Sequence, residues 1–242
     1  MFYQRIAHYL LVLLLSAGIA YQAQAQNRDA VLAKLSESLG NRSLKEAPFL
    51  MFTCISGHPY TKGEHSFLYD WNEKLGRFEG QTSTGEEVIV LFDSEAMSGK
   101  VFINKKPTDD PELLKNIIQL FEDDSFLLFI PIRIANKELS ASLQETEIIN
   151  SRKYFVLKVS TPDAKFETNR LYIDTQNGKL SIWKTYDKKQ NKMQELVVSR
   201  IKDAGGGLNL PTVFTDKVSG KIYQYPIVAA LMNIEDSKFK NP

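Results

Sequence analysis

The clearest alternation of hydrophobic and polar positions lies between residues 49 and 104. Within it, one set of alternate positions reads His65, Phe67, Tyr69 and Trp71. The positions between them read Glu64, Ser66, Leu68 and Asp70. This period of two is the one expected of a β-strand with an apolar and a polar face. The aromatic face predicts a sheet surface that is covered by another element or by a ligand.

Five strands are predicted in this run, at 49–56, 63–71, 75–82, 86–93 and 99–104. The connections between them are short and rich in Gly, Pro, Asn and Ser, which favours antiparallel neighbours over crossover connections. The segment Val88–Phe92 is apolar at every position. We therefore expect it to be a central strand that is covered on both faces.

Two amphipathic helices are predicted from apolar positions at helical spacing. In the first, Asn27 and Asp29 offer capping side chains and Gly40 marks the end; its apolar stripe is Val31, Leu32, Leu35 and Leu39. The strand run that follows is the nearest large apolar surface in the sequence. We therefore expect this stripe to pack on it.

The second helix is predicted to begin with Asp110 as the N-cap and Pro111 at its first position. Its broad stripe consists of Leu113, Leu114, Ile117, Ile118, Leu120 and Phe121. Asp123 and Asp124 are expected to end or restart the helix. The very apolar segment Phe126–Pro131 follows, and Pro107 and Pro131 would bracket an insertion between two sheet segments.

The second half of the chain returns to a strand pattern. Strands are predicted at 142–150, 154–160, 170–174, 179–186, 193–201, 208–215 and 221–232. Asn177-Gly178 is a strong hairpin signal, and Gly205-Gly206-Gly207 predicts another sharp reversal. The predicted fold is mainly β (α+β), with one strongly curved antiparallel sheet wrapped around the helices as a half-open barrel. It forms a single domain over 26–234, followed by a polar, frayed tail at 235–242.

The first 25 residues have the pattern of a secretory signal peptide. Arg5 precedes an apolar core from Tyr9 to Ala20, and Ala23-Gln24-Ala25 is a small-residue cleavage pattern before Gln26. About twelve apolar residues rise only about 18 Å as a helix, well short of a bilayer core of about 30 Å. We expect export to the periplasm. Because no cysteine follows the cleavage site, we expect no lipid anchor.

Composition narrows the classes of function. The 242 residues are 43% hydrophobic and 11% aromatic, enough for an ordinary globular core. There are 30 basic and 29 acidic residues, and removing residues 1–25 takes away only Arg5, which leaves 29 of each. This balance gives no indication of nucleic-acid binding. The single cysteine, Cys54, cannot form an internal disulfide, and its apolar strand predicts a buried, inert thiol.

Candidate chemistry is sparse. A hydrolase would need Cys54 with His58 or His65, but neither histidine lies in a recognisable motif. A zinc site would draw on His58, His65, Glu64 and Asp70, yet His65 and Glu64 point to opposite faces of their strand. No glycine-rich loop precedes a helix, so no nucleotide cofactor is indicated. We expect no catalytic residue, no metal and no cofactor.

The high aromatic content is the remaining feature of the sequence that bears on function. It is compatible with a packed core and with a cavity for an apolar ligand. For the second case, side-chain alternation and helical spacing suggest an apolar pocket lined by Phe52, Phe67, Tyr69, Trp71, Val90, Phe92, Ile117, Phe121, Phe126, Leu128 and Trp183. A register error of one residue would turn any strand's set outward.

The ordered motifs resemble a known family. The segments that carry the resemblance are His65–Trp71, Arg77–Glu79, Glu87–Val90, Asp124–Leu128 with Pro131, and Leu171–Asp174 leading to Trp183. Together they resemble the periplasmic carriers of outer-membrane lipoproteins, the LolA and LolB type, and more closely an uncharacterised exported branch with that fold. The likeness runs from about Ala47 to Phe214. That branch usually has a Tyr-Trp pair where this chain has Phe126-Leu127, and an Asn where it has Asp123.

The resemblance implies an incomplete barrel with a helical lid and a cavity that accepts acyl chains. A buried methylene contributes about 0.8 kcal/mol, so ten contribute about 8, against an association cost of about 4 to 15 kcal/mol. We therefore expect a ligand with several chains, such as a phospholipid or a triacylated lipoprotein, bound by a monomer. An envelope membrane is a further expected partner. The alternatives are an envelope assembly module with a filled core and an exposed strand edge, and, third, a hydrolase that uses Cys54 or His65.

Overall fold

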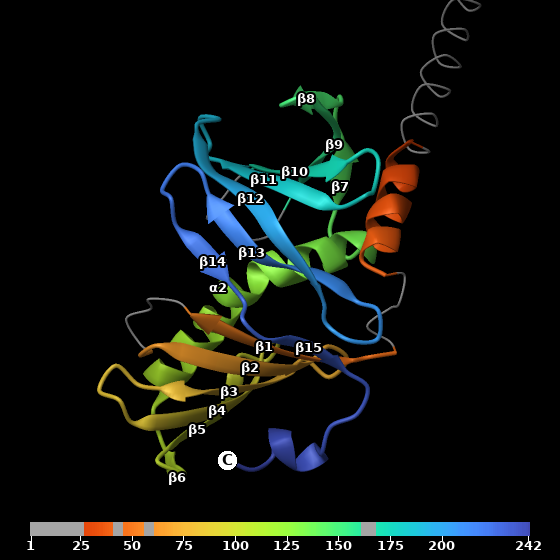
Figure 1. Ribbon diagram of the computed structural model, residues 1–242. Helices are drawn as coiled ribbons and strands as arrows, with labels where there is room; N and C mark the ends of the chain where they lie inside the picture. The colour runs from red at the N-terminus through yellow and green to blue at the C-terminus, as the bar shows by residue number, and fades with distance from the viewer. Residues whose placement is uncertain (1–26, 41–45, 56–60, 161–167) are drawn as a thin grey trace, which may run out of the picture.

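The fold consists of two antiparallel sheets with a long helix running along both (Figure 1). The structure is a computed structural model, and it describes residues 27–40, 46–55, 61–160 and 168–242. The predicted signal peptide, with its cleavage site before Gln26, and His58 lie outside these residues. None of the helices within them is long and apolar enough to cross a membrane.

The first sheet has seven strands. Their order is β15 (Val228–Leu231), β1 (Phe49–Ile55), β2 (Glu64–Asp70), β3 (Leu75–Gln81), β4 (Glu87–Asp93), β5 (Ser98–Ile103) and β6 (Lys106–Thr108). The five strands predicted from residues 49 to 104 are confirmed, with boundaries that agree within one residue. The register places aromatic and β-branched residues opposite one another on the inner face, in the row Phe52, Phe67, Phe78, Val90 and Val101. Such cross-strand pairs stabilise a sheet.

The second sheet has the order β14 (Ile222–Gln224), β13 (Asn209–Asp216), β12 (Lys192–Asp203), β11 (Leu180–Tyr186), β10 (Thr168–Asp174), β9 (Arg152–Val159) and β7 (Ala141–Leu143). The short strand β8 (Glu147–Ile149) also pairs with β9. The predicted strand at 142–150 is thus two strands, β7 and β8. The Asn177-Gly178 hairpin and the triple-glycine reversal are both confirmed, between β10 and β11 and between β12 and β13.

The prediction of a single curved sheet was wrong, and Pro226 provides the physical reason. We expected one strand over 221–232, but this segment forms β14 in the second sheet and β15 in the first. Between them, Pro226 has no backbone N–H to continue a ladder. The two residues beside Pro226 bond to different sheets. Tyr225 N donates to Thr212 O in the second sheet at 2.9 Å, and Ile227 O accepts from Thr53 N in the first sheet at 2.9 Å. The chain therefore leaves one sheet and joins the other.

Helix α2 (Pro111–Ala135) begins as predicted. Asp110 caps it by accepting from Leu113 N at 2.9 Å, and Pro111 occupies the first turn. The expectation that Asp123 and Asp124 interrupt the helix was wrong, because α2 continues through them and through Pro131. The buried residues run without a break in pattern from Ile117 to Ile134. Burial of this stripe keeps the helix intact despite the cost of an interior proline.

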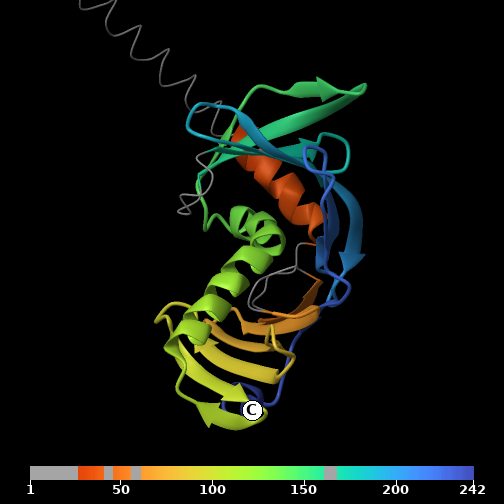
Figure 2. The ribbon, with the colours of Figure 1, turned by 90° about the vertical axis from the view of Figure 1, so that its left-hand side faces the viewer.

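The N-terminal helix, residues 27–38, packs on the second sheet and not on the first, so this expectation also fails (Figure 2). Lys34 Nζ donates to Thr175 O at 3.0 Å. Gly178, with φ +71°, lies so close that a Cβ there would be 2.4 Å from the Lys34 carbonyl oxygen. The predicted stripe, Val31, Leu32, Leu35 and Leu39, is buried in the main core. The helix therefore does not pack on the sheet whose strands follow it directly in the sequence.

The C-terminal residues lie on the outer face of the first sheet, where the sequence predicts a frayed tail. Residues Asp236–Phe239 form the 3₁₀-helix η1, which packs against β3. The ring of Phe239 stacks on Phe49 with 6.3 Å between centroids. The buried Arg77 donates from Nη1 to Lys238 O at 3.0 Å and to Asn241 O at 2.6 Å. These contacts cover part of the outer face of β3. The segment Val88–Phe92 of β4 is buried at every position, as predicted.

Candidate ligand-binding site

A pocket of about 360 Å³ opens where the end of β2 meets α2. Its lining residues are Tyr69, Trp71, Lys74, Glu95, Phe121, Glu122, Ser125, Phe126, Phe129, Ile130, Arg133 and Glu138. Those from α2 recur at intervals of three and four residues, which places them on one face of the helix. Small-molecule pockets typically occupy about 300 to 1,000 Å³, so this one lies at the lower end of that range.

Aromatic rings form the inner wall of the pocket. The ring of Tyr69 lies 4.7 Å from that of Phe121, and the ring of Trp71 lies 4.8 Å from that of Phe129, measured between centroids. Tyr69 also shares a hydrogen bond of 3.1 Å with Ser94 Oγ. Burial raises the pKa of Tyr69 above its ordinary value, although the bond to Ser94 acts in the opposite direction. The phenol therefore stays neutral and contributes an apolar surface.

The rim of the pocket is charged. Lys74, in a turn with φ +60°, places its ammonium 5.4 Å from the centre of the Trp71 ring. Arg133 Nε lies 3.9 Å from Glu138 Oε2, and both side chains are partly exposed, so this pair adds little stability. Glu95 and Glu122 complete the rim. An apolar floor with a charged rim suits an amphipathic ligand whose polar end stays in water.

Four of the eleven residues suggested by the sequence line this pocket: Tyr69, Trp71, Phe121 and Phe126. The other seven do not line it and are buried in the main core: Phe52, Phe67, Val90, Phe92, Ile117, Leu128 and Trp183. Trp183 donates from Nε1 to Asn169 Oδ1 at 3.1 Å. Its ring lies 5.1 Å from that of the half-buried Phe126. Trp183 therefore supports the pocket wall from behind.

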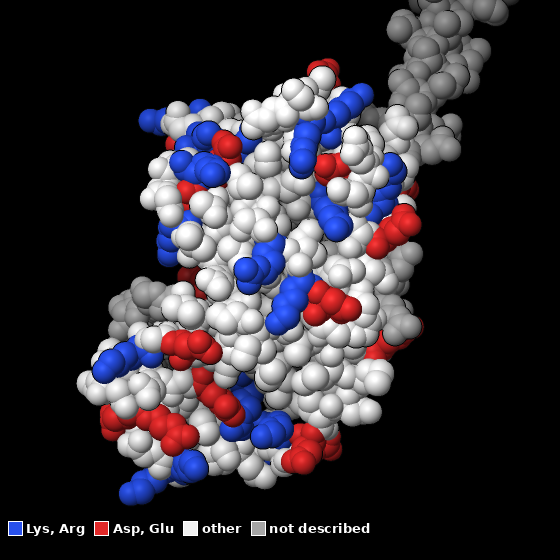
Figure 3. Space-filling view, viewed as in Figure 1, with Lys and Arg blue, Asp and Glu red and all other residues white. Residues whose placement is uncertain are grey.

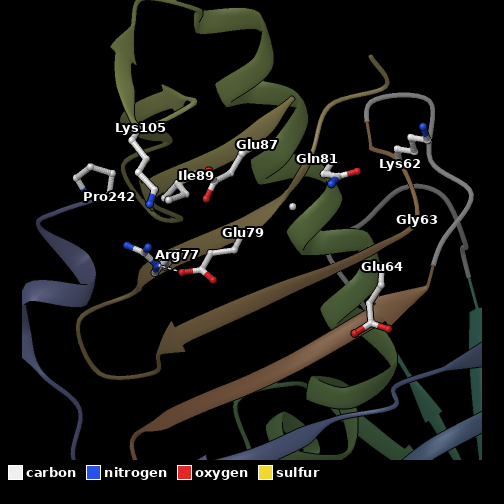
Figure 4. Close-up of a pocket in the computed structure, with 11 residues that line it drawn as sticks. Lys62, Gly63, Glu64, Arg77, Glu79, Gln81, Glu87, Ile89, Lys105 and Pro242 are labelled. Atoms are coloured by element: carbon white, nitrogen blue, oxygen red, sulfur yellow. Dashed lines mark hydrogen bonds and ion pairs between the residues drawn. The ribbon is translucent and has the colours of Figure 1, made fainter. Parts of the chain in front are cut away.

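A second, larger hollow of about 900 Å³ lies on the outer face of the first sheet and is polar. Figure 4 shows its side chains on one side of β3 and β4, among them Arg77, Glu79, Glu87 and Lys105. Arg77 forms an ion pair with Glu79, besides its bonds to the C-terminal carbonyls. Basic and acidic residues are interspersed on the face shown in Figure 3. Neither the polar hollow nor this mixed surface suits an acyl chain or a nucleic acid.

The geometry around Cys54 gives no support to the hydrolase alternative. Burial raises the pKa of the Cys54 thiol well above its ordinary value, and the neighbouring Asp124 carboxylate raises it further. A nucleophilic cysteine needs a lowered pKa and access to substrate. Its neighbour His65 is buried and bonded through Nε2 to Asp124 Oδ2 at 2.7 Å. The thiol is buried, as predicted.

Comparison with known proteins adds the following. No family model matches the chain, and no curated protein matches it. Solved structures do match. The chain is similar to structures of the LolA superfamily.

One is a LolA superfamily protein from Nitrosomonas europaea, with 12% identity over 85% of this chain and 95% of that one, at a TM-score of 0.47. Another is a DUF1329 family protein from Desulfovibrio piger, with 10% identity over 89% and 97% and a TM-score of 0.48. A third is the complex of MucA and MucB from Pseudomonas aeruginosa, with 12% identity over 88% and 60% and a TM-score of 0.26. At these values the LolA likeness is distant, and neither ligand nor partner follows from it.

Sequence reasoning missed the part of the pocket that α2 forms beyond Phe126. Phe129, Ile130 and Arg133 line it because α2 continues as one helix, where we had expected an interruption at Asp123 and Asp124. The helical spacing from Phe121 to Ser125 and on to Phe129 was readable in the sequence. Lys74 and Glu95 lie in turns, and only the pairing of β3 with β4 brings those turns together. The short connection between these strands predicts that pairing, but no local pattern indicates that α2 packs beside the two turns.

Proposed function

We propose that this protein is a non-catalytic periplasmic carrier that binds an acyl chain of a lipid or lipidated protein in the pocket between β2 and α2. The observation that carries the proposal is the aromatic wall beneath a charged rim. The rings of Tyr69, Trp71, Phe121 and Phe129 contact one another, and Phe126 also lines the pocket. An amphipathic ligand fits this order of surfaces, with its chain on the rings and its head group at the rim. The periplasmic location rests on the signal-peptide pattern.

The volume limits how much of a ligand enters. A methylene group is about as large as a water molecule, whose share of liquid volume is about 30 Å³. The pocket therefore accommodates about twelve methylenes, worth about 10 kcal/mol gross against an association cost of about 4 to 15 kcal/mol. The volume therefore has room for one chain, and the gross gain from that chain lies within the range of the association cost, so contacts of the head group at the rim have to add to the affinity. The further chains of a multi-chain ligand would have to lie at the rim or widen the pocket by displacing Phe126.

The alternative of an assembly module with an exposed strand edge has less support. Three of the edge strands, β6, β7 and β14, have only three residues each. In β6, Lys106 and Pro107 are both exposed. Short edges with lysine and proline are the features by which sheets avoid pairing with other chains.

The test is lipid extraction and native mass spectrometry of protein purified from the periplasm, followed by titration with a fluorescent acyl probe. Ser125→Leu puts three carbon atoms in place of a hydroxyl group in the pocket, because Ser125 is buried and lines it. The matched control is Gln119→Leu, which introduces the same residue on the exposed face of the same helix. We expect the first variant to weaken probe binding at least tenfold and the control to bind as the wild type. Equal binding by all three proteins, or none by the wild type, would refute the proposal.

A further inference from the structure

Three potential metal ligands meet beneath α2, although they come from three separate elements. Cys54 in β1 and His65 in β2 are direct partners in the antiparallel register, so their side chains share one face of the sheet. Asp124 reaches them from the middle of α2. One donor atom of each residue, a sulfur, an imidazole nitrogen and a carboxylate oxygen, lies within 4.8 Å of the other two.

The cluster is almost closed to solvent. The side chain of His65 is fully buried, and that of Asp124 is 13% exposed. Tyr225 Oη donates to the backbone oxygen of Asp124 at 2.7 Å, which holds this turn of α2 over the sheet. His65 is flanked by the rings of Phe67 and Phe78, both 5.5 Å away between centroids. The donors therefore have little freedom to rearrange, and the partly exposed Asp124 lies toward solvent.

The hydrogen bond between His65 and Asp124 does not account for the third member of the cluster. The Cys54 thiol lies beside the Asp124 carboxylate, and the pocket proposed above does not use it. His65 Nδ1 is buried with no hydrogen-bond partner in the part of the chain that the structure describes. It stays unpaired whether or not an ion binds Nε2, so the proposal rests on the three donors alone.

We propose that Cys54, His65 and Asp124 bind one Zn²⁺ ion, with the fourth position taken by water. Thiolate and imidazole are ligands that Zn²⁺ prefers, whereas Ca²⁺ and Mg²⁺ prefer oxygen donors throughout. Three protein ligands and one open position form a recurrent zinc arrangement. The proposal is independent of lipid binding, because none of the three ligands lines the pocket.

The proton balance of binding is simple. The Cys54 thiol releases its proton to solvent and binds as the thiolate. A neutral His65 moves its ring proton from Nε2 to Nδ1, so that Nε2 can bind the metal. Two ligands at about 2.0 to 2.1 Å from a tetrahedral ion lie about 3.3 Å apart. The present Nε2–Oδ2 distance is 2.7 Å. Asp124 therefore has to withdraw by about 0.6 Å, which its position at the solvent side permits.

Such an ion would hold α2 against β1 and β2 within the part of the helix that lines the pocket, since Asp124 lies between the lining residues Glu122 and Ser125. Metal binding of this kind contributes directly to folding stability. The expected consequence is a rise in melting temperature on adding Zn²⁺.

The experiment uses the full exported chain, stripped with chelator and fully reduced, and titrated with Co²⁺ as a spectroscopic probe. We expect a thiolate-to-cobalt absorption band, visible bands of tetrahedral intensity, and loss of both on adding one equivalent of Zn²⁺. Cys54→Ser should abolish the thiolate band, and Asp124→Asn should weaken cobalt binding at least tenfold. The matched control is Asp123→Asn, which removes the adjacent, exposed carboxylate of α2 and should leave the titration unchanged.

Should the substituted proteins not fold, the wild type alone decides the matter, because the thiolate band and the Zn²⁺-dependent rise in melting temperature need no variant. Wild-type protein with reduced Cys54 but no thiolate band would overturn the proposal. So would a cobalt titration that is identical in the wild type, Cys54→Ser and Asp124→Asn.

Discussion

The ring of Tyr69, near the end of β2, lies 4.7 Å from the ring of Phe121, in the middle of α2. This contact packs the long helix against the first sheet, and both rings belong to the inner wall of the pocket. Phe121 contacts four further rings, those of Phe52, Phe67, Phe92 and Phe129, at 5.2 to 6.3 Å between centroids. Phe121 therefore contributes to the stability of the fold and also limits the size of the pocket.

Replacing Phe121 separates these two roles. Phe121→Ala is expected to lower the free energy of unfolding by about 3 to 5 kcal/mol, because it removes a buried ring from a packed cluster. Urea unfolding measures this change. The half-buried Phe126 serves as the control, and Phe126→Ala should cost less than half as much. If Phe121→Ala folds, its enlarged apolar pocket should bind the acyl probe at least as well as the wild type. A smaller loss of stability for Phe121 than for Phe126 would contradict this account.

Pro131 offers a second test, because it lies inside α2 and is buried. It lacks the N–H that would bond to the Leu127 carbonyl, and an interior proline costs a helix about 3 kcal/mol relative to alanine. Pro131→Ala loses some buried ring surface, so we expect a net gain of about 1 to 2 kcal/mol in the free energy of unfolding. Pro111→Ala is the control. Proline is favourable at the first helical position, so no gain is expected there. Destabilisation by Pro131→Ala would show that the ring has a packing role that the helix requires.

Five of the seven strands of the first sheet could be predicted to within one residue at each end, but the arrangement of the two sheets could not. Strands such as β2 show their inward side chains in a period of two, and the turns between the first five strands are local. Whether β15 pairs with β1 or continues β14 depends on a partner more than 170 residues away. The clue was Pro226, a single residue without a ladder donor, which a strand pattern over 221–232 concealed.

In the candidate site, too, local patterns could be predicted from the sequence and long-range packing could not. Tyr69, Trp71 and Phe121 could be named from alternation and helical spacing, because their faces repeat locally. The seven other suggested residues that line the core share that pattern, and only packing decides which ring borders an opening. Asp124 could not have been grouped with Cys54 and His65, because its approach depends on α2 remaining helical past residue 124. Local periodicity indicates a face, but not what lies opposite it.

The hairpin at Gly178 yields a matched pair of substitutions. Gly178 and Gly220 both have a left-handed backbone, with φ +71° and +74°. A Cβ at Gly178 would lie 2.4 Å from the Lys34 carbonyl oxygen, whereas one at Gly220 would meet no atom within 4 Å. Both alanine variants bear a backbone cost of about 1 to 2 kcal/mol. Gly178→Ala should lower the free energy of unfolding in urea by more than Gly220→Ala does, because it also displaces the N-terminal helix. Equal losses would show that this helix does not hold its position against the hairpin.

Asp216 makes stability depend on acid pH. Burial would raise the pKa of its carboxyl, but hydrogen bonds from Ser219 Oγ and from the amides of Val218 and Glu195 outweigh burial and lower the pKa. Because the folded-state pKa lies below the unfolded value of about 3.9, this stabilisation is complete above that value. It is lost as the pH falls through the folded-state pKa. Asp216→Asn removes charged acceptors, and at pH 7 we expect it to cost about 1 to 3 kcal/mol.

The difference between the wild type and Asp216→Asn should shrink as the pH falls below about 4, since the wild-type carboxyl then takes up a proton in both states. Urea unfolding of both proteins at pH 7, 5, 4 and 3 measures this directly, and comparing them removes the contribution of the other carboxylates. Asp187→Asn is a useful control, because Asp187 also has a lowered pKa but lies on the surface, where solvent screening makes its bonds to Asn191 weak. A constant difference across this range for Asp216→Asn would mean that the side chain acts through shape and not through its charge.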